Sequence, residues 1–297
     1  MAKEKFSNGA TEQIQETGTA VQETETTSVA TTGFEEFAGA GLETVTAQDI
    51  NIPYITFLQS GSPQVKKGNE KRIEGASEGD IVATGVNRLY KVDDTGHSPL
   101  NVSVVQKVTL LTEWAPNRGG LQGYHSVTKK DELGIKKTKN SDGKEILVLP
   151  NGNEIQETDY LFCVAIPETK ETPFFCIMSM AQTKRSSVRE LFTKLMFDCQ
   201  SALPTFAFIY TLGSVVRTKE DWSWVVPTFT KVTSDDGVSY VDSRGIINRS
   251  DAKGAQIFET CVNLFKTIKD VGIENFLSRG NTDDYEEIDS TAAGEII

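Results

Sequence analysis

The sequence contains little histidine and cysteine, and this scarcity argues against metal chemistry. There are two histidines, His97 and His125, and four cysteines, none of them in a CxxC pair. The cysteines lie far apart in apolar surroundings: Cys163, Cys176, Cys199 and Cys261. Buried free thiols in a reducing cytoplasm explain this pattern better than disulfides or a zinc site. We therefore expect no metal site.

Motifs of catalysis and of membrane insertion are also missing. The sequence has no GxxxxGK[ST], no GxGxxG after a predicted strand, no HExxH and no GxSxG. His125 lies in a glycine-flanked loop, where a lone histidine is more often solvent-exposed than catalytic. The N-terminus has no apolar signal segment, and no apolar run is long enough to span a membrane. We expect a cytoplasmic protein that is not an enzyme, has no cofactor and has no membrane partner.

Acidic charge is concentrated at the two ends of the chain. Residues 1–49 contain nine acidic residues and two lysines, and residues 280–297 contain six acidic residues and no basic one. The net charge of the whole chain is -12, so the residues between these ends are close to neutral. The N-terminal stretch is rich in Thr, Glu, Gln and Gly and cannot bury enough apolar surface to fold. We predict a disordered segment 1–45, a folded core 46–279 and a disordered acidic tail 280–297.

Two apolar stripes predict amphipathic helices in the core. Ser187–Glu190 has the form of a capping box, and behind it six apolar residues recur at helical spacing: Val188, Leu191, Phe192, Leu195, Met196 and Cys199. Ser250 or Asp251 can cap a second helix that ends near Gly272. Its stripe consists of Ile257, Phe258, Cys261, Val262, Phe265 and Ile268.

Most other apolar segments have the composition of β-strands, and the stretch 115–145 is loop-like. Asp235-Asp236-Gly237 is typical of a hairpin turn. The predicted strands are 81–86, 100–111, 160–166, 174–180, 205–212, 223–230 and 237–241. Because strands and helices do not alternate as βαβ units, we expect an α+β fold with an antiparallel, barrel-like sheet decorated by two helices.

Basic and aromatic residues occur together at four places in the predicted core. A groove for a single strand needs cations along the phosphates and aromatic faces for the bases. Cations that precede a helix also favour an anion at its N-terminus. The candidate residues are Lys66, Lys67, Lys71 and Arg72 in a loop; Trp114, Arg118 and Tyr124 in a Gly-rich segment; Lys184 and Arg185 before a helix; and Arg217, Trp222 and Trp224 near a strand.

Each of these groups also has a structural explanation. Lysine clusters on loops, including Lys129–Lys144, are usually only solvated. Trp222 and Trp224 have the two-residue spacing that places both on one face of a strand, where they can equally pack against the core. Lys184 and Arg185 can simply border the start of a helix. Only the joint occurrence of the groups in a nearly neutral core favours nucleic-acid binding.

The C-terminal segment is acidic and has apolar residues at its end. Its carboxylates are Asp283, Asp284, Glu286, Glu287, Asp289 and Glu295, and the chain ends in Ile296-Ile297. Such a tail can mimic nucleic acid, and can occupy a basic groove of its own chain or of a partner. A tail that only increases solubility is the alternative.

Several short motifs resemble a group of tailed-phage single-stranded DNA-binding proteins. They are Gly41–Ile50, Ile52-Pro53, Leu58–Lys67, Ile73–Ala76, Gly79-Asp80, Ser179–Lys184, Pro204 with the strand after it, and Trp222–Trp224. The resemblance implies an OB-type core, cooperative coating of single-stranded DNA and a C-terminal tail that recruits phage replication proteins. The core exceeds a minimal OB barrel, so additional helices and loops must decorate it.

Our first hypothesis is therefore a sequence-tolerant single-stranded DNA-binding protein that protects strands in phage DNA replication or recombination. The alternative is a structural or virion-associated interaction protein without nucleic-acid binding. A nuclease is disfavoured by the missing catalytic site. The oligomeric state is left open, with a homo-oligomer among the alternatives.

Overall fold

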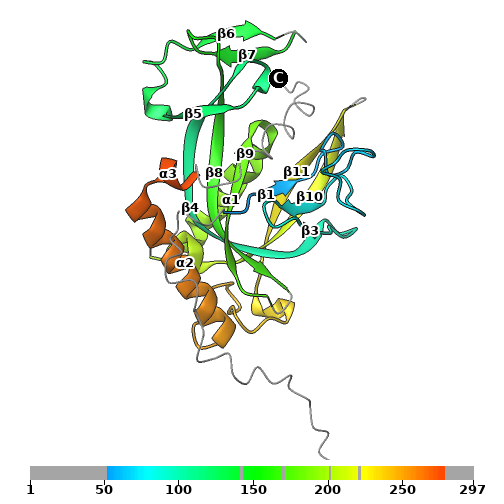
Figure 1. Ribbon diagram of the computed structural model, residues 1–297. Helices are drawn as coiled ribbons and strands as arrows, with labels where there is room; N and C mark the ends of the chain where they lie inside the picture. The colour runs from blue at the N-terminus through cyan, green and yellow to red at the C-terminus, as the bar shows by residue number, and fades with distance from the viewer. Residues whose placement is uncertain (1–51, 141–142, 169–170, 201, 220–221, 278–297) are drawn as a thin grey trace, which may run out of the picture. The chain divides into compact units, whose positions relative to one another are not determined.

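Two long neighbouring strands form the centre of the fold. β4 (His97–Trp114) and β8 (Glu154–Pro167) pair antiparallel from Leu100 opposite Pro167 to Trp114 opposite Glu154, with a bulge near Val104. They appear in the computed structural model of the chain (Figure 1), which describes residues 52–277 except 141–142, 169–170, 201 and 220–221. The predicted disordered segments 1–45 and 280–297 lie outside the described residues.

Six more strands extend this pair into an eight-stranded sheet. They are β5 (Leu121–Ser126), β6 (Lys136–Lys139), β7 (Glu145–Val148), β9 (Phe174–Ala181), β10 (Tyr210–Lys219) and β11 (Trp222–Lys231). The order is β11-β10-β4-β8-β7-β6, with β5 paired to β4 and β9 paired to β8. All of these pairings are antiparallel, which confirms the predicted α+β class. Among the described residues β11 and β6 do not pair, so the sheet is not closed into the barrel that we expected.

A small sheet and three α-helices complete the fold. The small sheet has the order β1 (Ile55–Phe57), β2 (Ile81–Ala83) and β3 (Arg88–Tyr90). The helices are α1 (Arg185–Cys199), α2 (Ala252–Val271) and α3 (Ile273–Leu277). Short 3-10 helices connect elements: η2 (Pro116–Arg118), η3 (Val127–Lys129), η4 (Gln182–Lys184), η5 (Thr205–Ala207) and η6 (Ser234–Asp236). No described helix has the length and apolar content that crossing a membrane requires.

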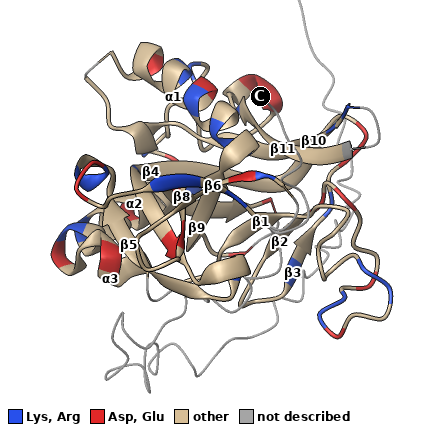
Figure 2. Ribbon diagram, turned by 90° about the horizontal axis from the view of Figure 1, so that it is seen from above, with Lys and Arg blue, Asp and Glu red and all other residues tan. Residues whose placement is uncertain are grey.

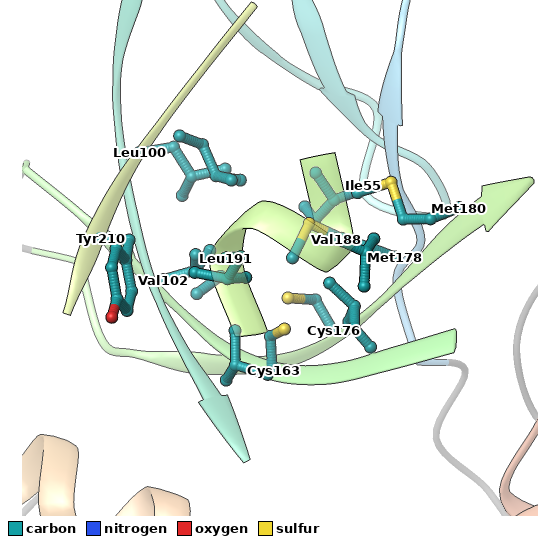
Figure 3. Packing of buried hydrophobic residues seen from close by; sticks show 14 of the residues in the cluster. Ile55, Leu100, Val102, Cys163, Cys176, Met178, Met180, Val188, Leu191 and Tyr210 are labelled. Carbon is teal, nitrogen blue, oxygen red and sulfur yellow. The ribbon is translucent and has the colours of Figure 1, made fainter. Parts of the chain in front are cut away.

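The large sheet separates two apolar cores because its side chains alternate between its faces. On one face, Cys163 and Met178 pack with Val188 of α1 and with the small sheet (Figure 3). On the other face, Phe162 packs with α2 and α3, and its ring meets that of Phe276 edge-on at 5.4 Å. The result is three layers, with the large sheet in the middle.

Both predicted helices exist, and their ends show which features the local sequence pattern predicts correctly. Asp251 caps α2 by accepting a hydrogen bond from the Gly254 backbone N–H, and the helix ends at Gly272, as predicted. The capping box at Ser187–Glu190 is wrong: α1 begins at Arg185 because η4 leads directly into it, and no side chain caps it. The predicted burial of Met196 is also wrong, since this side chain is 77% exposed.

Two segments differ from the sequence-based prediction. The stretch predicted as a loop, 115–145, contains β5 and β6, which belong to an arm with a small apolar core around Leu111 and Ile155. Residues 237–241 form no strand beyond an isolated bridge at Val241, and Asp235-Asp236-Gly237 ends the 3-10 helix η6. The hairpin partner of β11 is instead β10.

Candidate nucleic-acid interface

The β10–β11 hairpin presents cations opposite tryptophans. Its register pairs Arg217 with Trp224 and Lys219 with Trp222. Directly opposite residues of an antiparallel pair have their side chains on the same face, so Arg217 lies beside the half-buried Trp224 ring. Arg217 and Lys219 are exposed, and neither forms an ion pair with another described residue. The description of Trp222 is limited to its backbone.

A close crossing of two backbones positions this hairpin. Where β10 meets the start of β4, a Cβ on Gly213 would collide with the Gly96 carbonyl oxygen. The Ser214 backbone N–H donates to that same oxygen at 3.0 Å, and the Ser98 hydroxyl donates to the Leu212 carbonyl at 2.8 Å. Only glycine at position 213 permits this approach, so the sequence itself sets where the hairpin leaves the sheet.

The predicted basic loop lies on the same side of the molecule as the hairpin. The segment that follows this loop is joined to the hairpin, because the Ser214 hydroxyl donates to the Gly79 carbonyl at 2.6 Å and the Ser223 hydroxyl donates to Glu78 at 3.1 Å. Figure 2 shows basic residues on the loop beside β3 and near the tip of β10. The exposed cations of the loop are Lys66, Lys67, Lys71 and Arg72. We call these four with Arg217, Lys219 and Trp224 the hairpin site.

Lys184 and Arg185 differ in how their charges are used. Both lie at the start of α1, and η4, which contains Lys184, contacts β11. Lys184 forms no ion pair with the described residues. The Arg185 guanidinium donates from Nη2 to Glu157 at 2.7 Å and from Nε to Asp159 at 3.1 Å. The charge of Arg185 is thus paired within the protein, whereas Lys184 can bind a phosphate.

The predicted group in the Gly-rich segment lies in the arm, away from the hairpin. β10 pairs with β4 at residues 97–102 and β5 pairs with it at 110–114, so the two places are roughly 40 Å apart along the strand. Trp114 is 4% exposed, and the Arg118 guanidinium lies over its ring, 5.6 Å from the centroid, and is paired with Glu154 at 3.2 Å. Tyr124 packs edge-on against Tyr160 at 5.7 Å. In this structure these side chains hold the arm together, and a base cannot reach the buried Trp114.

A family of phage proteins matches most of this chain. The model of the Pam3 phage gp34-like protein family matches residues 22–254. The chain belongs to this family. The match indicates a phage protein, as the sequence motifs predicted. No curated protein and no solved structure matches the chain.

The matched range helps to locate the part of the chain that is characteristic of the gp34-like family. It includes the basic loop, α1 and the whole β10–β11 hairpin. It stops at residue 254, near the start of α2, and leaves out the acidic C-terminal segment. The residues of the hairpin site thus all lie within the matched range, and the acidic C-terminal segment lies outside it.

One cluster in the arm escaped the sequence analysis. Glu113 accepts hydrogen bonds from Asn151 at 3.0 Å and from Asn153 at 2.5 Å, and its other oxygen lies 2.6 Å from His125 Nε2. Burial alone would raise the pKa of Glu113, but the hydrogen bonds from Asn153, His125 and Asn151 outweigh it and hold the pKa below its ordinary value. His125 is thus half-buried and paired, not the solvent-exposed residue that we expected.

This cluster joins β4, β5 and the turn between β7 and β8. The partners of Glu113 are 12, 38 and 40 residues away along the chain, so no local motif could reveal them. Among the described residues, no Ser, Thr or Cys side chain forms a hydrogen bond with the His125 ring, whose partner is Glu113. Among the described residues there is also no group of three or more His, Cys, Asp or Glu side chains that could hold a metal ion.

Proposed function

We propose that this phage protein binds single-stranded DNA with little sequence preference, and protects it during replication or recombination. The observation that carries the proposal is the register of the hairpin, which sets the exposed Arg217 opposite the half-buried Trp224. A cation beside an aromatic face is the combination that single-strand binding uses for phosphate and base. The four cations of the basic loop extend this surface beyond the hairpin.

Arg217 and Lys219 differ from many other cations of the core in their contacts with carboxylates. Several cations elsewhere in the described core are paired with carboxylates, as Lys91 is with Asp80 and Lys107 is with Asp159. The hairpin cations have no such described partner, so a phosphate does not have to displace a carboxylate. An OB-type origin of the core stays a prediction, and the proposal does not depend on it, because an open antiparallel face can present the same groups.

Titration of labelled oligo-dT, followed by fluorescence anisotropy, tests the proposal. We expect binding that weakens with salt and that prefers a single strand to a duplex, since phosphates supply the affinity and unpaired bases supply the stacking. Trp224→Ala should weaken binding by about 1–3 kcal/mol, the usual value of one base stack, and Trp224→Phe should retain part of it. Lys137→Ala in the arm, an exposed lysine paired with Glu145, is the matched control and should bind normally.

Trp224 is half-buried, so its alanine variant can also lose stability. For this reason the exposed pair Arg217→Ala/Lys219→Ala supplies a second test that leaves the core intact. Circular dichroism establishes which variants are folded. Folded variants of both kinds that bind oligo-dT like the unmodified protein would show that the hairpin is not the binding site.

A further inference from the structure

The outward face of α1 carries two strongly exposed apolar side chains. Met196 is 77% exposed and Phe197 is 75% exposed, the highest values for large apolar residues in the described part of the chain. Single exposed apolar residues are ordinary, but two large ones side by side on a helix usually mark a surface that binds something. The sequence placed Met196 in the core and gave no role to Phe197.

Helix α1 adjoins the hairpin site. It contacts β11, and η4 at its start contacts the same strand (Figure 1). Arg217 is close enough to Glu190 of α1 to help lower the pKa of that carboxyl, after the larger effect of Lys194. The Arg217 end of the hairpin site therefore lies near α1, and β11 is the edge strand of the sheet between them.

The charges on α1 leave a positive surplus on this path. Glu190 is paired with Lys194 at 2.8 Å, and Asp198 is paired with Lys231 at 3.0 Å. These are the two acidic residues of the helix, so neither presents an unpaired carboxylate to a phosphate. Arg189, in contrast, is exposed and forms no ion pair with the described residues, and Lys184 precedes the helix.

We propose that single-stranded DNA continues from Trp224 across α1, with Phe197 as a second platform for a base and Arg189 as a phosphate contact. This inference rests on the proposed function and extends it. From Lys184 to Phe197 the helix is about 20 Å long, enough for several nucleotides. The second platform is therefore occupied only by oligonucleotides that are longer than the hairpin footprint. A protein partner at this apolar surface is the competing occupant, and it would not need the unpaired cations.

The test measures the affinity of single-substitution variants, each changed at an exposed position, for oligo-dT of increasing length. Phe197→Ala should weaken the binding of long oligonucleotides about 5- to 150-fold, the equivalent of one lost stack, and leave the shortest ones that still bind unaffected. Phe197→Trp should restore or strengthen the binding of long oligonucleotides. Val86→Ala is the matched control, because Val86 is also an exposed apolar residue but lies in the turn between β2 and β3.

The possible results separate this inference from the proposed function. If the unmodified protein binds no oligonucleotide, both fail. If Trp224→Ala weakens binding while Phe197→Ala binds every length normally, the strand does not cross α1, although the hairpin site stands. Sedimentation velocity adds a third readout: a Phe197→Ala variant that loses self-association but keeps its DNA affinity would assign this surface to a second copy of the chain and overturn the inference.

Discussion

Asp159 is a buried carboxylate between two cations of the core. Its side chain is 1% exposed and accepts a hydrogen bond from Thr109 at 2.6 Å, with Lys107 and Arg185 each at 3.1 Å. Burial alone would raise the pKa of Asp159. The hydrogen bonds from Thr109, Arg185 and Lys107 outweigh that effect, so the pKa lies below its ordinary value of 3.8.

Asp159→Asn keeps the size of the side chain and removes its charge. Arg185 retains Glu157, but Lys107, whose side chain is half-buried, loses its carboxylate partner. Removing one member of a buried ion cluster costs about 3–5 kcal/mol, because the remaining charge is left without compensation. For a domain of this size about 1 kcal/mol corresponds to roughly 2–4 °C, so the melting temperature should fall by about 6–20 °C.

Urea unfolding followed by circular dichroism measures this loss at pH 7. The matched control is Glu145→Gln, which breaks the exposed pair with Lys137 and should cost less than about 1 kcal/mol. Because the folded pKa of Asp159 is lowered, its contribution is complete above the ordinary value and is lost as the pH falls through the folded one. The difference in the free energy of unfolding between Asp159→Asn and the unmodified protein should therefore become smaller below about pH 4. A loss under about 1 kcal/mol at pH 7, or a gap that does not change with pH, would refute the reasoning.

Four further outcomes are expected. Each phosphate contact contributes about 0.7 to the slope of log affinity against log salt, so Arg217→Ala/Lys219→Ala should make this slope shallower by about 1.4. An unchanged slope would show that these two cations do not contact phosphates. Gly213→Ala should destabilise the protein by about 1–3 kcal/mol in urea unfolding, because its Cβ would collide with a backbone oxygen; a neutral variant would contradict this contact. Cys163, whose pKa burial raises, should resist alkylation until the protein unfolds, as mass spectrometry can show. Removing residues 280–297 should strengthen oligo-dT binding most at low salt, where six carboxylates compete best; equal affinities would argue for a tail that only increases solubility.

Local patterns predicted helix α2 almost completely. The apolar stripe, the Asp251 cap and the end at Gly272 all depend on residues within a few positions of each other. The apolar stripe predicted helix α1 less well. Its start depends on η4, and Met196 is exposed because no described element packs against it. Spacing along one helix shows which residues share a face, but it does not show which part of that face a neighbour covers.

Long-range pairing decided the role of most candidate site residues. Arg185 meets carboxylates 26 and 28 residues away, and Trp114 is buried in the arm, where the Arg118 guanidinium lies over its ring. Both residues carry the chemistry that nucleic-acid binding uses. In the folded protein, however, both side chains contact other parts of the same chain, because segments that are distant in the sequence supply their partners.

The hairpin shows the same division most clearly. The composition of residues 223–230 predicted a strand there, and the two-residue spacing of Trp222 and Trp224 places both on one face of a strand, because alternation is a local property of extended backbone. That Arg217 lies opposite Trp224 follows only from the register of β10 against β11, and that register depends on the length of the turn and on the crossing at Gly213. A one-residue shift would place the cation on the other face, so the tertiary structure alone could bring the two groups of the proposed site together.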